Sequence, residues 1–130
     1  MVNGVCSKAY GLGNIVNAIK DYEVSYGMEM ERDVEIAVVV HGGGGNLVVQ
    51  DAVLRAKGKG SNPFENEIRT LLAKGVRVYM CQNTARSMVK SGALTAGYVT
   101  SELIEGVEFV TAGVTAIPDF QSLGYKYVQP

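Results

Sequence analysis

Cys81 is the residue of this sequence with the most distinctive chemistry. It ends the apolar run VRVYMC, residues 76–81, and Gln82, Asn83 and Thr84 lead from it into a segment that can be helical. A cysteine reacts as its thiolate, which a nearby helix N-terminus or cation favours. Unpaired N–H groups of the residues that follow would point toward a negative sulfur or a bound anion. The position predicts a reactive thiol, and the alternative is a small core residue, because cysteine is among the most buried residue types.

Few other residues could assist a thiol or hold a metal. With two cysteines and one histidine, a zinc site within one chain is hard to assemble, and we expect no metal or organic cofactor. Arg86, in the first helical turn, could add positive charge near Cys81. Thr84 stands where a dithiol motif would have its second cysteine, which argues against thioredoxin-type exchange, and Cys6 could resolve a bond to Cys81 only if the fold brought the two together. Two cysteines form no disulfide scaffold, so we expect a cytoplasmic protein with reduced thiols.

A second candidate segment follows another apolar run, where His41 precedes Gly42, Gly43, Gly44 and Gly45. A phosphate-binding loop of the Walker type would need a Lys-Ser/Thr pair after the glycines, and the dinucleotide pattern G-x-G-x-x-G is not completed. We therefore interpret the glycines as a loop whose backbone closely approaches another backbone or a small anion, with a purely structural turn as the alternative. His41 could be hydrogen-bonded scaffold, donate to that anion, or influence the thiolate.

The charge and the distribution of apolar residues argue against two classes of partner, nucleic acids and membranes. The formal charge is −1 and no basic stripe is present, so we expect no nucleic-acid binding. The small cluster of Arg55, Lys57 and Lys59 is typical of a solvated loop, with phosphate binding as the less favoured alternative. No run of about 18 apolar residues occurs, so no membrane partner is expected.

Strand and helix patterns alternate along the chain. Apolar runs predict strands over residues 34–40, 76–81 and 107–111, and a final strand, with an edge position as one option, over 125–129. Helical spacing predicts helices over residues 9–26, 46–56, 62–74, 84–90 and 114–123. Asn62 is expected to cap the third of these helices, with Pro63 in its first turn and Glu65 completing a capping box.

This alternation predicts an α/β fold with a parallel sheet, formed by one domain over residues 1–130. Parallel strands bring their carboxyl ends to one rim, where ligands collect in open sheets. Three segments would meet there: 41–45, 81–84 and 111–113. The candidate binding residues are therefore His41, Gly42, Gly43, Gly44, Gln82, Asn83 and Thr84, around Cys81 as the candidate catalytic residue.

In this order, the stretches VVVHGGGG, NPFENEIRTLLAKGVRVYMCQNT and EGVEFVTAGVTAIPDFQSLGYKYVQP resemble the DsrE/DsrF-like family of small α/β proteins. The family is associated with intracellular sulfur oxidation and sulfur relay. The resemblance implies a three-layer α/β/α sandwich with a mainly parallel sheet of about five strands, and homo- or hetero-oligomers, often trimers or hexamers. Only MVNGVCS precedes the first predicted helix, so we expect the first strand to be short or truncated.

The resemblance also implies a role for the cysteine. In sulfur-relay members a cysteine at this strand end carries sulfur as a persulfide, and here that residue is Cys81. The leading hypothesis is a sulfur-carrier or sulfurtransferase-like protein, closer to a carrier than to a turnover enzyme, with sulfur donor and acceptor proteins as partners. The alternative is a non-catalytic protein of the same fold that binds a small anion or acts through an oligomeric surface.

Overall fold

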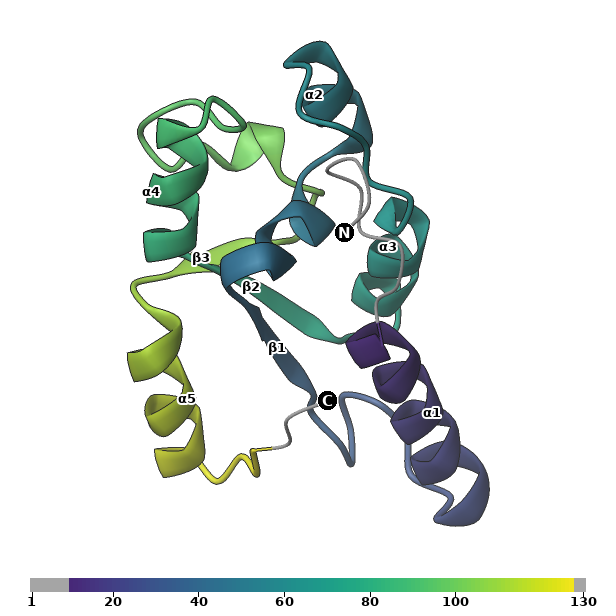
Figure 1. Cartoon of the computed structure of the whole chain (residues 1–130). Coiled ribbons are helices and arrows are strands. Elements are labelled where there is room, and N and C mark those ends of the chain that lie inside the picture. The colour runs from purple at the N-terminus through teal and green to yellow at the C-terminus, as the bar shows by residue number, and fades with distance from the viewer. Residues whose placement is uncertain (1–9, 128–130) are drawn as a thin grey trace.

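Three parallel strands form the centre of the structure. It is a computed structural model, and it describes residues 10–127. The strands are β1 (Ala37–Val40), β2 (Arg77–Cys81) and β3 (Glu108–Val110), in the order β1-β2-β3. The pairs Val38–Val78 and Met80–Phe109 set the register. All three carboxyl ends therefore lie at one rim, as the alternating pattern predicts (Figure 1).

Helices cover both faces of this sheet. On one side lie α1 (Tyr10–Ser25) and α3 (Glu65–Ala73), and on the other lie α4 (Gln82–Lys90) and α5 (Gly113–Ser122) (Figure 1). This arrangement confirms the predicted three-layer α/β/α sandwich. The helices α1, α4 and α5 agree with the predicted ranges to within about two residues, whereas α3 begins three residues later than predicted and α2 (Asp51–Ala56) begins five residues later.

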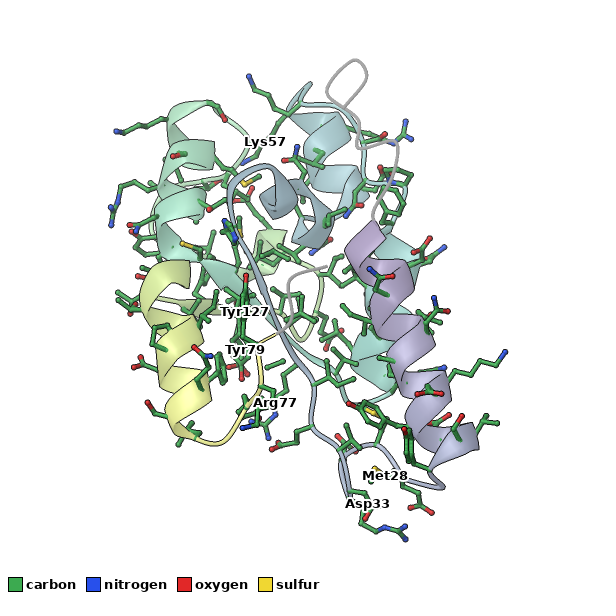
Figure 2. The ribbon with its side chains drawn as sticks, turned by 60° about the horizontal axis from the view of Figure 1, so that its bottom comes forward. Met28, Asp33, Lys57, Arg77, Tyr79 and Tyr127 are labelled. Carbon is green, nitrogen blue, oxygen red and sulfur yellow. The ribbon has the colours of Figure 1, made fainter. Side chains whose placement is uncertain are left out.

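The number of strands differs from the expectation of about five, because residues 10–127 contribute three to the sheet. The expected first strand lies outside the described residues. The predicted strand at 125–129 is wrong for its described part: Tyr125 turns back after α5, its ring centroid 5.2 Å from that of Phe120 and its hydroxyl donating to Glu35 at 3.1 Å. These contacts hold the chain near Arg77 and Tyr79, toward the end of the sheet away from Lys57 (Figure 2).

The core lies mainly between the sheet and the helix pair α1 and α3. Val78 and Met80 of β2 are almost completely buried, as are Ile19 of α1 and Ile68 and Leu71 of α3. Helical spacing in α3 predicts this stripe, because residues three and four apart share one face. Only the second half of the predicted strand 34–40 is regular, and β1 is half-buried over most of its length because it is the outer strand of the described sheet.

The connection from β1 to α2 departs from the predicted continuous helix over 46–56. A 3₁₀ helix, η1 (Gly42–Val48), comes first, and α2 is confined to Asp51–Ala56. The backbone is extended between them because Val49 forms a bridge with Leu103, and the Ile104 N–H donates to the Val48 carbonyl at 2.9 Å. Leu103 follows a second 3₁₀ turn, η2 (Thr100–Glu102).

Asn62 has a different role from the predicted helix cap. It is 4% exposed, and its amide donates to the carbonyls of Leu47 and Val49, both at 2.8 Å. Its side-chain oxygen accepts from the Phe64 N–H at 3.0 Å, so the turn before α3 is fixed, but Phe64 occupies the N-cap position. The side-chain oxygen thus fixes the turn before α3, and the amide, which cannot cap a helix N-terminus, holds this turn against the end of η1.

Candidate functional site

Cys81 lies where strand β2 becomes helix α4. It is the last residue of β2, pairs with Val110 of β3, and is the N-cap residue of α4. Its side chain makes no capping hydrogen bond to the first turn of that helix. It is 4% exposed, so the thiol is enclosed by protein at the rim instead of lying open on it.

The other predicted site residues lie on the segments that follow β1 and β2. His41 is exposed and extended, and its carbonyl accepts from the Gly44 N–H at 3.0 Å. Gly42 has a φ of 56°, a left-handed conformation that favours glycine, and its N–H donates to the Thr84 hydroxyl at 2.8 Å. This hydrogen bond joins the ends of β1 and β2, as the parallel order predicts. Gln82 is half-buried at the start of α4.

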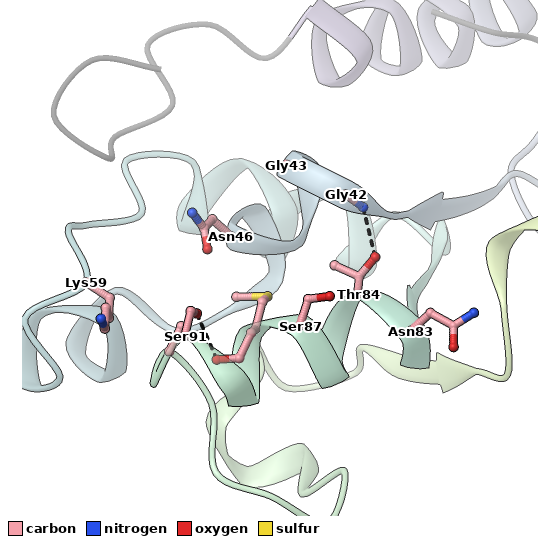
Figure 3. A pocket seen from close by; sticks show the side chains of 10 residues that line it. Gly42, Gly43, Asn46, Lys59, Asn83, Thr84, Ser87 and Ser91 are labelled. Carbon is pink, nitrogen blue, oxygen red and sulfur yellow. Dashed lines mark hydrogen bonds between the residues drawn. The ribbon is translucent and has the colours of Figure 1, made fainter.

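A cleft of about 580 Å³ lies between η1 and α4 (Figure 3). Four predicted binding residues are part of its lining: Gly42, Gly43, Asn83 and Thr84. Cys81, His41, Gly44 and Gln82 do not line it. The lining is completed by residues that the sequence analysis did not select as a site: Asn46, Lys59, Ser87, Met88, Ser91 and Ala93.

One signal for this cleft was present in the sequence. Asn83, Ser87 and Ser91 are spaced by four residues, and such residues lie on one face of a helix. This polar row along α4 could have been identified as a wall of a site. Asn46 had no comparable signal, and Lys59 was considered only as part of the basic cluster, with phosphate binding as the less favoured alternative, because only the fold brings these segments to α4.

Gly45 sets the distance between η1 and α4. A Cβ atom there would lie 2.8 Å from both the Met88 sulfur and the Thr84 methyl carbon, and 3.2 Å from the end of Met80. The glycine segment therefore does make a close approach, although its neighbours are side chains and not a backbone or an anion. This contact fixes the position of one cleft wall against the other.

The three residues of the basic cluster, Arg55, Lys57 and Lys59, have different partners. Arg55 pairs with Asp51 at 2.7 Å, and Lys57 pairs with Glu102 at 2.5 Å. Hydrogen bonds from the Asn62 N–H and from Arg55 lower the pKa of the Asp51 carboxyl below its ordinary value. Of the cluster, only Lys59 lines the cleft, and no salt bridge engages it within the described part of the chain.

Arg86, the cation that the sequence suggests near Cys81, is hydrogen-bonded to two neighbouring side chains. Its guanidinium donates to the Asn83 side-chain oxygen and to the Tyr98 hydroxyl, both at 3.1 Å, on the outer surface of α4. Across residues 10–127, no three His, Cys, Asp or Glu side chains gather in a group that could hold a metal ion. None of the described helices is long and apolar enough to cross a membrane.

Comparisons with known proteins give a family and one similar structure. The model of the DsrE/DsrF-like family matches residues 6–130. The chain is similar to a solved structure, that of MTH1491 from Methanobacterium thermoautotrophicum, a protein of unknown function, with 26% identity and a TM-score of 0.66. The match covers 93% of this chain and 85% of the other. No curated protein gives a significant match.

Proposed function

The chain belongs to the DsrE/DsrF-like family, and from this premise we propose that it is a sulfur carrier in which Cys81 holds sulfane sulfur as a persulfide. Membership indicates a role related to sulfur relay, which this family is associated with. The observation that carries the finer proposal is the position of Cys81, at the carboxyl end of a central parallel strand and at the N-cap of a helix. Ligands of open parallel sheets collect at such strand ends.

The proposed transfer consists of two exchanges at sulfur. The Cys81 thiolate attacks the terminal sulfur of a donor persulfide, an S–S bond forms to Cys81, and the donor leaves as its thiolate. An acceptor thiolate then attacks the terminal sulfur carried by Cys81, takes it as a new persulfide, and releases the Cys81 thiolate. The two steps balance without an external oxidant or reductant, so the protein acts as a carrier and is restored after each cycle.

The burial of Cys81 adds a requirement to this proposal. Only 4% of the Cys81 residue is exposed in the described conformation, which leaves little of it open to a donor. The segments that enclose Cys81 at the rim must therefore open before the thiolate can attack. A donor or acceptor protein that binds the rim could stabilise this open form.

Mass spectrometry after incubation with glutathione persulfide or thiosulfate tests the proposal. We expect the wild-type protein to gain the mass of one sulfur atom, with the modified peptide containing Cys81. Cys6→Ser is the matched control and should gain sulfur as the wild type does, whereas Cys81→Ser should not. No added sulfur on the wild type, or equal labelling of Cys81→Ser, would contradict the proposal.

Self-association stays a prediction from the family, as a homo-oligomer of three or six copies. Large apolar side chains on the surface of α1 and after it are consistent with a protein interface, since Tyr26 is 65% exposed and Val24 75%. Tyr22 and Tyr26 lie together there, with ring centroids 6.2 Å apart. Light scattering would measure the number of copies directly.

A further inference from the structure

The cleft between η1 and α4 has a lining that is basic at one end and otherwise neutral. Its ten lining residues include one cation, Lys59, and no carboxylate. Asn46 and Asn83 provide amides, and Ser87 and Ser91 provide hydroxyls. A negatively charged ligand would therefore meet one positive partner and several hydrogen-bonding groups, and no charge that repels it.

Several of these groups are available to a ligand. Within the described part of the chain, the side chains of Asn46, Ser87 and Lys59 make no hydrogen bond or salt bridge to another residue. Ser91 already donates to the Met88 carbonyl at 3.0 Å, which leaves its oxygen able to accept. Asn46 on η1 and Ser87 on α4 come from opposite walls of the cleft (Figure 3).

The two ends of the cleft are held by the fold. At one end the Gly42 N–H donates to Thr84, which ties η1 to the first turn of α4. At the other end the Lys59 side chain lies over Gly92, where an added Cβ would be 3.4 Å from the lysine Cε. The Lys59 N–H donates to the Leu54 carbonyl at 2.9 Å, so its backbone is fixed by the turn after α2. The cation therefore has a defined place relative to the polar row on α4.

We propose that this cleft binds a small organic anion, whose carboxylate or phosphate group pairs with Lys59 and whose polar body is hydrogen-bonded by Asn46 and Ser87. The volume of about 580 Å³ is within the range of small-molecule sites, and it exceeds what an inorganic phosphate alone would fill. Met88 and Ala93 add an apolar part to the lining. Cys81 is not part of it, so this site goes beyond the sulfur carrier and does not depend on it.

The competing explanation of Lys59 is structural. Its side chain lies at the C-terminal end of α4, where a cation is stabilised by the partial negative charge of the last carbonyl groups. This role would make Lys59 contribute to stability without any ligand. Measuring both stability and binding in one variant separates the two explanations.

The test is a titration of the full chain at constant ionic strength, followed by two-dimensional ¹H–¹⁵N NMR. The probes are glycerol 3-phosphate, lactate and inorganic phosphate. We expect saturable shifts at the amides of Gly42, Gly43, Asn46 and Ser87, with an organic anion binding more tightly than inorganic phosphate. Comparing glycerol 3-phosphate with lactate shows whether the acidic group is a phosphate or a carboxylate.

Variants decide whether the site is the one proposed. Lys59→Gln should weaken binding about tenfold, the loss typical of one hydrogen bond to a charged group. The matched control is Lys90→Gln, an exposed lysine at the end of α4 that does not line the cleft, and it should bind as the wild type does. Cys81→Ser should also bind normally, so failure of the sulfur-carrier proposal would leave this one standing.

Three outcomes would overturn the proposal. Shifts that do not saturate, or that spread over lysines far from the cleft, indicate non-specific ion binding. Equal affinity of Lys59→Gln and wild type removes the lysine from any site. A lower urea midpoint for Lys59→Gln with unchanged affinity assigns Lys59 to the stability of α4 alone.

Discussion

Two connections at the rim of the sheet are attached to the protein in different ways. Residues 41–50, between β1 and α2, contain Gly45 packed on α4 and end in Val48 and Val49, which are completely buried. Residues 91–103, between α4 and β3, have an exposed stretch from Thr95 to Ser101. The first connection is part of the core, whereas the exposed stretch of the second is a surface segment.

Polar contacts attach this second connection. The Glu102 carboxylate accepts from the Thr95 N–H at 2.7 Å and pairs with Lys57. The Gln50 amide donates to the carbonyls of Ser101 and Leu103 at 2.8 and 2.9 Å. The hydrogen bonds to the Thr95 N–H and the Ser101 carbonyl are exposed, so each contributes less than the burial that holds residues 41–50. We therefore expect substitutions that affect the first connection to cost more stability than those in the second.

The largest effect is expected for Asn62→Ala. The substitution removes two hydrogen bonds to carbonyls at the end of η1 and one to the Phe64 N–H, and it leaves the Val49 carbonyl buried without this partner. We expect the free energy of unfolding in urea to fall by about 3 kcal/mol. Asn66→Ala, at an exposed position of α3, should change it by no more than about 0.5 kcal/mol. Similar losses in the two variants would show that the first connection does not depend on Asn62.

Gly45→Ala should have the next largest effect. The new methyl group would lie 2.8 Å from atoms of Thr84 and Met88, so η1 and α4 must separate. Overpacking of this kind costs about 1–3 kcal/mol, which urea denaturation would measure. Gly43→Ala is the matched control, because no atom lies within 4 Å of a Cβ placed there. If both alanine variants were equally stable, the close packing of η1 on α4 would be disproved.

The smallest effect concerns Glu102 and acid. Burial alone raises the pKa of the Glu102 carboxyl, but hydrogen bonds from Lys57 and Thr95 outweigh it and hold the pKa below its ordinary value of 4.5. The carboxylate therefore stabilises the fold above pH 4.5, and this contribution is lost as the pH falls through the lower pKa of the folded state. We expect Glu102→Gln to lose about 1 kcal/mol or less at pH 7 and to show a weaker decline in stability toward pH 3.

Urea midpoints at several pH values would measure this difference. Glu105→Gln serves as the control, because Glu105 is exposed and forms no salt bridge among the described residues, and it should keep the pH dependence of the wild type. A Glu102→Gln variant with the wild-type acid profile would contradict the assignment. It would also mean that the second connection is held by its backbone contacts and not by this ion pair.

The two proposed functions differ in whether the protein must change its conformation. Sulfur transfer at Cys81 requires the protein around this residue to open, because only 4% of the residue is exposed. The cleft, in contrast, is accessible without any such movement, because its walls already stand apart with polar side chains between them. Only the proposed sulfur transfer therefore requires a change of conformation.

The sequence predicted those parts of the fold that depend on the spacing of apolar residues within one segment. The stripe Phe64, Ile68, Leu71 and Leu72 of α3 faces the core as its spacing indicates. The break between η1 and α2 could not be predicted, because it comes from pairing of Val49 with Leu103, which is 54 positions later in the chain. The prediction that Asn62 caps α3 was wrong, because Phe64 is the N-cap residue, and no signal in the sequence indicated that the Asn62 amide would donate to the distant carbonyls of Leu47 and Val49.

The sequence by itself determined the alternation of strands and helices and the position of Cys81 between β2 and α4, because hydrophobic periodicity acts within a few residues. Only the tertiary structure decided that Cys81 is enclosed and that Asn46, Lys59 and Ser87 share a cleft. Exposure and shared walls depend on which segments pack against one another. That packing is set by the sheet order and by contacts such as Gly45 on α4, which no single stretch of the chain contains.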